Sequence, residues 1–232
     1  RLLFLIALSG FLIACIGCAR TNNFYVLVTF RVMQGFFGGA LMPLMFSCIY
    51  ILFTPKQLPF ALALTATVGV SSIAFGPAIG GFMTEMINWR WMFLYNLPIG
   101  IVILFLAIIF IDLKEKEPEL AKQIDYYGII LLAIGLLSLL IVLQEGSRLD
   151  WSKATEIRLA TILSITCIIL FFLREFTAKY PIIDLKVFSN RNFTIGCINV
   201  VVFGVSIYAP IFLLPVYLGE VRGIGPWEIG IM

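Results

Sequence analysis

Long apolar segments dominate this sequence and restrict the folds that are open to it. Seven of them approach or exceed the roughly 17 to 25 residues that a helix needs to cross the hydrocarbon of a bilayer. Only helices can cross singly, because every backbone polar group needs a partner within its own segment. We therefore predict an all-α, polytopic transmembrane bundle with helices over 2–19, 24–53, 60–84, 91–111, 126–143, 157–173 and 193–218, and an eighth apolar run from Trp227.

The composition agrees with a membrane protein and argues against several other classes. Only 12% of the residues are charged and 61% are hydrophobic, whereas soluble domains carry about 25% charged residues. No basic cluster is interleaved with aromatic residues in a polar stretch, so we expect no nucleic-acid partner. The sequence has no histidine, and Cys15 and Cys18 lie in an apolar segment. We therefore expect no metal, and we interpret the cysteines as small packing residues.

The lysines and arginines between the segments predict the orientation of the chain. If Arg1 is placed on one side, that side carries nine basic residues: Arg1, Lys56, Lys114, Lys116, Lys122, Arg174, Lys179, Lys186 and Arg191. The opposite side carries five: Arg20, Arg90, Arg148, Lys153 and Arg222. Because cytoplasmic loops are enriched in these residues, we predict that the side of Arg1 is cytoplasmic.

Arg31 is the most informative single residue, since the other residues of 24–53 carry no charge. An arginine at the centre of a bilayer costs roughly 3 kcal/mol or more. One explanation is that Arg31, about 10 Å of helix rise from the start of its segment, extends to the interface. The alternative is a functional site, because Gln34, Gly35 and Gly38 share one helix face with Arg31, and Gly39 follows directly. That face can approach a neighbouring helix closely and still offer polar groups to a buried path.

A second face of small residues lies in the third segment. Gly69, Ser72, Gly76 and Gly80 fall within a stripe about 80° wide at 100° per residue, and such stripes permit close helix contact. Pro77 removes a backbone donor and favours a kink. We expect Ala78 and Ile79 to lie on another face. Simple helix packing and conformational change both remain open as roles for this stripe.

Three stretches resemble one known family. Residues 31–35 (RVMQG) resemble an RxxQG signature, residues 76–81 (GPAIGG) resemble the antiporter signature GPxxGG, and residues 88–100 resemble the run WRWxFxxNxPxG. Residues 181–188 are similar to the stretch before the ninth helix of the same family. The sequence is thereby similar to the major facilitator superfamily, and within it to the fourteen-helix drug:proton antiporters of the EmrB/QacA type. The family often has glycine at the position of Ser72.

The resemblance implies a domain organisation in which the chain matches helices three to nine. Residues 1–111 would be the last four helices of the N-terminal bundle, and 112–125 a cytoplasmic linker. Residues 126–173 would be two extra helices, 174–192 a cytoplasmic loop, and 193–232 the start of the C-terminal bundle. The chain starts directly before a helix and ends as another apolar run opens. We therefore expect it to be a piece of a longer polytopic protein.

The resemblance also implies a function: proton-coupled export of small amphipathic or toxic compounds by alternating access, with no enzymatic activity and no cofactor. Arg31 and Gln34 would serve proton coupling, while Gly35, Gly38, Gly39, Gly69, Ser72, Gly76, Pro77, Gly80 and Gly81 would serve helix contact and conformational change. The partners would be the lipid bilayer, a small-molecule substrate, protons and, in a double-membrane bacterium, a periplasmic adaptor protein. The protein would be a multi-pass protein of a bacterial inner membrane.

Other interpretations stay open from the sequence. The transporter could carry one specific metabolite in either direction, or the chain could be a polytopic membrane enzyme or a non-functional fragment. Glu85 is the acid nearest to a membrane segment, and we interpret it as a solvated charge at the interface rather than as a transport residue.

The orientation gives a first testable prediction. In the full-length protein, a cysteine at position 116 should be labelled by an impermeant thiol reagent only from the cytoplasmic side, and one at position 147 only from outside. The reason is the excess of lysine and arginine on the side of Arg1. The native cysteines are removed for this measurement. Labelling of position 116 from outside would overturn the orientation.

Overall fold

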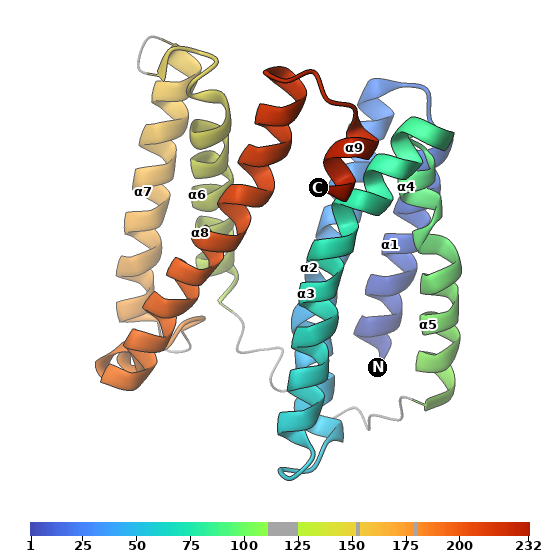
Figure 1. Ribbon diagram of the computed structural model, residues 1–232. Coiled ribbons are helices and arrows are strands. Elements are labelled where there is room, and N and C mark those ends of the chain that lie inside the picture. The colour runs from blue at the N-terminus through green and yellow to red at the C-terminus, as the bar shows by residue number, and fades with distance from the viewer. Residues whose placement is uncertain (111–124, 152–153, 179–180) are drawn as a thin grey trace. The chain divides into compact units, whose positions relative to one another are not determined.

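The computed structural model describes residues 1–110, 125–151, 154–178 and 181–232, and within these ranges all regular structure is helical (Figure 1). In chain order the elements are α1 (Leu2–Arg20), α2 (Phe24–Leu52), α3 (Leu58–Phe82), the π-helical turn η1 (Met83–Ile87), α4 (Trp91–Leu94), α5 (Asn96–Phe110), α6 (Tyr126–Glu145), α7 (Thr155–Thr177), the 3-10 turn η4 (Leu185–Ser189), α8 (Arg191–Glu220) and α9 (Pro226–Ile231). The predicted linker 112–125, which includes Lys116, lies outside the described residues except for Asp125.

The seven predicted segments all form helices that are long and apolar enough to cross a membrane, which confirms the predicted fold class. One of them differs in detail, because the expected helix 91–111 is interrupted at Tyr95 and so divides into α4 and α5. Pro98 explains the interruption, since it has no N–H to donate to the carbonyl of Leu94. Asn96 donates its side-chain Nδ2 to the Met92 carbonyl at 3.2 Å.

The chain divides into two compact units, which are described separately. The first unit contains α1 to α5, all of α9 and the end of α8. The second unit contains α6, α7 and the beginning of α8. The bundle boundaries that the family resemblance implies are not tested by this division and stay predictions.

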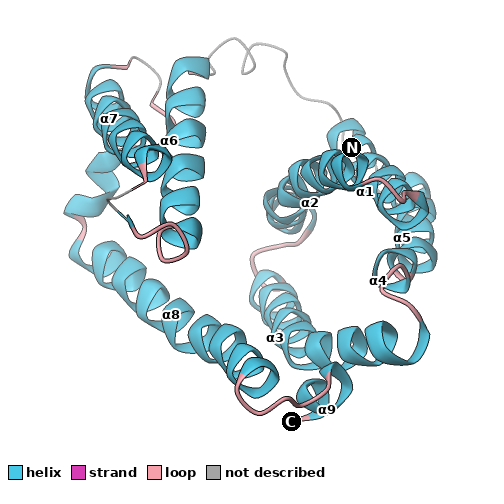
Figure 2. Cartoon of the chain, turned by 90° about the horizontal axis from the view of Figure 1, so that it is seen from above, coloured by secondary structure: helices cyan, strands magenta, loops and turns pink. Residues whose placement is uncertain are grey.

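In the first unit, α1 lies between α2 and α5 (Figure 2). Gly10 and Gly17 let α1 approach α2, because a Cβ at either position would run into the ring of Phe37 or Phe30. Small residues are expected at contacts between membrane helices. Lipid tails are as apolar as the helix surfaces, so helices associate mainly through close packing. Further along α1, Cys15, Cys18 and Ala19 pack with Phe93 of α4 in a buried cluster.

The second unit contains a hairpin of α6 and α7. The Ser164 hydroxyl donates to the Gly135 carbonyl at 3.0 Å, and both residues are buried. At the end of the hairpin that we predict to be cytoplasmic, Arg174 donates to both carboxylate oxygens of Asp125, at 3.0 and 3.3 Å. This contact holds the pKa of Asp125 below its ordinary value near 3.8. The buried Glu175 accepts the backbone N–H groups of Ile182 and Ile183, which holds these two residues against the end of α7.

Candidate functional site

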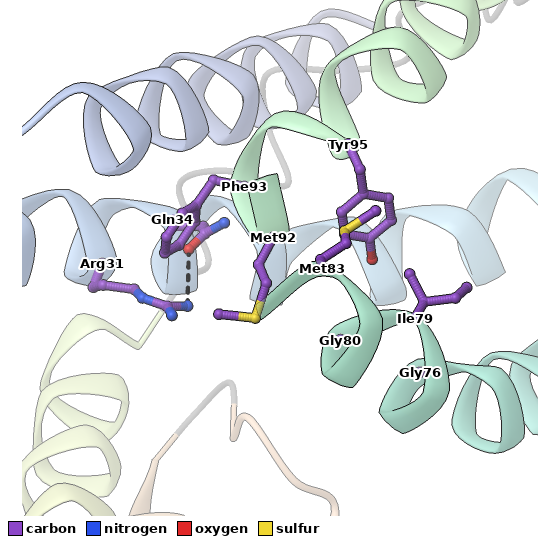
Figure 3. A pocket seen from close by; sticks show the side chains of 9 residues that line it. All are labelled: Arg31, Gln34, Gly76, Ile79, Gly80, Met83, Met92, Phe93 and Tyr95. Atoms are coloured by element: carbon purple, nitrogen blue, oxygen red, sulfur yellow. Dashed lines mark hydrogen bonds between the residues drawn. The ribbon is translucent and has the colours of Figure 1, made fainter. Parts of the chain in front are cut away.

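Arg31 and Gln34 lie one turn apart on α2 and are bonded to each other. Arg31 Nη1 donates to Gln34 Oε1 at 3.3 Å, and Gln34 Nε2 points to Cys15 Sγ on α1 at 3.1 Å (Figure 3). The thiol therefore orients the amide so that its oxygen faces the guanidinium. This order of groups follows from the helix spacing of positions 31 and 34 and from the close packing of α1 against α2.

The guanidinium of Arg31 also lies over an aromatic ring. Its Cζ is 4.4 Å from the centroid of the Phe93 ring, and Phe93 is only 2% exposed. A cation over the face of a ring gains about 0.5 to 2 kcal/mol, more when water is excluded. The ring is in turn fixed by Trp89, edge to face at a centroid distance of 6.0 Å. Protein groups thus hold the charge of Arg31 from two sides.

A cavity of about 250 Å³ opens beside this pair, within the first unit. Its lining comes from α2, α3, η1, α4 and Tyr95: Arg31, Gln34, Gly76, Ile79, Gly80, Met83, Met92, Phe93 and Tyr95. One permanent cation and one amide therefore face two thioethers, two aromatic rings and two glycines. In Figure 3, Arg31 and Gln34 lie on one side of the cavity and Gly76, Ile79 and Gly80 on the other.

The structure brings together only some of the residues expected at the site. Arg31, Gln34, Gly76 and Gly80 share the cavity. Two of the glycines that we expected at helix contacts do lie at such contacts. Gly38 lies against α1, where a Cβ would be 3.2 Å from the ring of Phe11, and Gly81 is buried against α9. Other members of the set have open space beside them in the described residues, namely Gly35, Gly39, Gly69, Gly76 and Gly80.

The stripe on α3 therefore has no close helix partner within the residues that the structure describes, and its predicted contact with another helix stays a prediction. Ser72 donates its hydroxyl to the Val68 carbonyl of its own helix at 2.8 Å. The sequence led us to expect Ala78 and Ile79 on another face than the stripe, but both positions still make contacts near the site. Ile79 lines the cavity, and Ala78 lies beside Gly230 of α9, because positions 76 to 81 are contacted from more than one side.

Sequence reasoning missed six residues of the site: Cys15, Ile79, Met83, Met92, Phe93 and Tyr95. The last three lie in the run 88–100, which served only to indicate the family. Cys15 was interpreted as a packing residue, and it is fully buried, but its sulfur also accepts the Gln34 amide. No periodicity within one helix could have indicated these contacts, because each of them joins residues from different helices.

The sequence matches the family described as "Major Facilitator Superfamily" over residues 1–232. The chain belongs to this superfamily. It is therefore part of a multi-pass integral membrane protein, consistent with the seven apolar helices among the residues that the structure describes.

Among curated proteins the chain is similar to several from bacteria. It is 33% identical to the "Colistin resistance protein EmrB" of Acinetobacter baumannii over 230 residues, which are 99% of this chain and 45% of that protein. It is 35% identical to the "Multidrug export protein EmrB" of Escherichia coli K12 over 95% of this chain and 43% of that protein. It is 37% identical to the "Fatty acid resistance protein FarB" of Neisseria gonorrhoeae, over 93% and 42%. The chain spans less than half the length of these relatives.

The bond between Cys15 and Gln34 generates a prediction about stability. Cys15→Ala should lower the unfolding temperature of the full-length protein in detergent more than Cys18→Ala does. The free energy of unfolding should fall by about 0.5 to 1.5 kcal/mol more in Cys15→Ala, because this variant also loses one hydrogen bond. Both thiols are fully buried on the same helix, so each variant leaves a similar void and only one loses the amide contact. Cys15→Ser should recover the difference, since a hydroxyl also accepts an N–H.

The measurement is thermal unfolding followed by tryptophan fluorescence, because Trp89 packs against the cluster of both cysteines. Equal losses in the two alanine variants would contradict a specific role of Cys15 in holding Gln34.

Proposed function

We propose that the full-length protein exports small amphipathic or toxic compounds in exchange for protons, by alternating access, without a cofactor. The observation that carries this proposal is the cavity in which Arg31 and Gln34 face thioethers, rings and glycines. The names of the relatives support it, since they describe multidrug export and resistance to colistin and to fatty acids. The resemblance of residues 76–81 to the antiporter signature supports exchange rather than uptake.

The lining of the cavity favours many substrates over one specific metabolite. A site for one metabolite needs several placed polar groups that fix its orientation. Here Met83 and Met92 contribute flexible, polarisable walls, and methionine is typical of surfaces that bind varied partners. Arg31 and Gln34 are polar and bonded to each other, and Tyr95 adds one hydroxyl. The same shortage of converging polar groups argues against a membrane enzyme.

The role of Arg31 in this proposal is electrostatic. A fixed guanidinium lowers the pKa of a nearby carboxyl group and so favours release of its proton. Gln34 keeps the guanidinium in one position and can hydrogen-bond a second group. Arg31 would thereby tune a carboxylate that carries the proton, or would hold the anionic end of a substrate. Both roles require that the charge stay in the cavity.

The expected surroundings follow from the same proposal. The protein would lie in the inner membrane of a bacterium, with substrate and protons as its small partners. The bacterial origin of the relatives supports this location. In a double-membrane bacterium, a periplasmic adaptor protein would carry the substrate onward.

Replacement of Arg31 tests the proposal. In the full-length protein, Arg31→Ala should reduce proton-coupled export at least about tenfold, because a charge-assisted contact is worth 1.5 to 3 kcal/mol. Expression should be largely intact. Arg31→Lys should rescue poorly, since an ammonium lacks the planar donors of a guanidinium. The measurement is transport in inverted vesicles under an imposed pH gradient. Wild-type rates in the alanine variant would indicate that Arg31 merely extends to the interface.

The stripe on α3 gives a separate prediction. Gly76→Leu and Gly80→Leu should each abolish export, because a leucine would fill the cavity and would wedge apart any helix that packs on the stripe. Ala74→Leu is the control, since position 74 is exposed and lies about 200° around the helix from Gly76. Pro77→Ala restores a backbone donor, so it should alter proton leak more than assembly.

Substrate efflux and proton leak are measured together in vesicles for these variants. Normal transport by both leucine variants would mean that the stripe faces lipid, and its glycines would then have no part in transport.

A further inference from the structure

The short helix α9 packs closely on the end of α3, within the first unit. Each helix brings a glycine to the contact. A Cβ at Gly230 would lie 2.5 Å from the Pro77 carbonyl oxygen and 2.9 Å from Ala78 Cα. A Cβ at Gly81 would run into the carbonyl group of Pro226. No side chain fits at either position without moving the backbone, so the two backbones approach directly.

Two interactions that involve side chains complete this contact. The rings of Phe82 and Trp227 meet edge to face, with centroids 5.4 Å apart. Glu85, in η1, accepts the backbone N–H of Trp227 through Oε2 at 2.8 Å. Gly225 leaves room for the carboxylate, since a Cβ there would lie 3.1 Å from the same oxygen. A residue 142 positions earlier in the chain therefore closes the contact.

The carboxylate of Glu85 suits the group that it meets. The first N–H groups of a helix have no partner within the helix, and they carry partial positive charge that a carboxylate complements. Other charges nearby are engaged elsewhere or exposed. Arg90 donates to Asn22 and lies over the Trp89 ring, and Glu228 lies on the exposed surface of α9.

The sequence led us to interpret Glu85 as a solvated charge at the interface. It is exposed, as expected, but it is also bonded across the contact. A hydrogen bond at an exposed position can be exchanged for one to water at small net cost. The contact of η1 and α3 with α9 can therefore open and close without leaving a buried group unpaired.

We propose that Glu85 is the latch residue of a releasable closure between the end of α3 and α9, on the side of the membrane that we predict to be external. This inference rests on the proposed function, in which the two halves of a transporter move against each other around a central site. Residues 58–87 and 226–231 belong to different halves under the family resemblance. Loss of the Glu85 contact shifts the population toward the state open to the outside.

Accessibility of a position on the α3 stripe tests the latch. The reporter is Ser72→Cys, one turn from Gly76 on the stripe, in the full-length protein with the partly exposed Cys48 and Cys197 replaced by alanine. An impermeant maleimide is added from the external side, and the labelling rate is measured. Glu85→Ala should raise the rate about five- to tenfold, which at 1.4 kcal/mol per factor of ten corresponds to about 1 to 1.4 kcal/mol, the size of one hydrogen bond at an exposed position.

The matched control is Glu228→Ala, which removes an exposed acid from the same contact region without touching the Trp227 N–H. It should label at the parent rate. Glu85→Gln keeps an acceptor oxygen without the charge and should give an intermediate rise of about threefold. If Glu85→Ala does not reach the membrane, the glutamine variant decides the question.

Parent rates in both Glu85 variants would overturn the latch, and so would an equal rise in Glu228→Ala. Labelling needs neither a substrate nor a proton gradient. The latch can therefore hold even if proton-coupled export fails its own test, and it can fail while export is confirmed.

Discussion

The placement of one permanent charge inside an apolar helix is the constraint on which the rest of the first unit depends. Arg31 costs roughly 3 kcal/mol or more if its charge meets lipid alone. In the structure, the Phe93 ring lies beneath the guanidinium, with its centroid 4.4 Å from Arg31 Cζ, and the amide oxygen of Gln34 lies beside the guanidinium. A cation–π contact of about 0.5 to 2 kcal/mol and a charge-assisted hydrogen bond of about 1.5 to 3 kcal/mol are together of the size needed.

This arrangement explains why the contacts around the site are made as they are. Phe93 can serve as a platform only if α4 is pressed against α1, and the buried cluster of Cys15, Cys18 and Ala19 provides that surface. Gln34 keeps its orientation because Cys15 accepts its amide. In lipid, helices gain little from burying apolar area, so close approach at small residues takes over that role. Arg31, Gln34 and Phe93 then face Gly76 and Gly80 of the α3 stripe across the cavity. Both glycines have open space beside them in the described residues.

The sequence predicted the helices well, because each membrane segment is long, apolar and bounded by polar or breaking residues. It also indicated Arg31 and Gln34, whose spacing of three places them on one face. Contacts between helices were not predictable in this way. Phe93 under Arg31, Cys15 beside Gln34 and Glu85 at the start of α9 join residues 62, 19 and 142 positions apart. The sequence analysis did not predict the break in the helix at Tyr95. It used Pro98 only as part of the stretch that indicates the family and did not consider that proline has no backbone N–H to donate.

The most direct measurement of this account is an experimental density map of the full-length protein in a lipid nanodisc, at a resolution that shows the Arg31 side chain. The account predicts the guanidinium over the face of the Phe93 ring, within about 6 Å of its centroid, and beside the Gln34 amide. A guanidinium turned away from that ring and placed among the lipid headgroups would contradict it. Arg31 would then be an interfacial residue, and the cavity would lose the charge on which the proposed function depends.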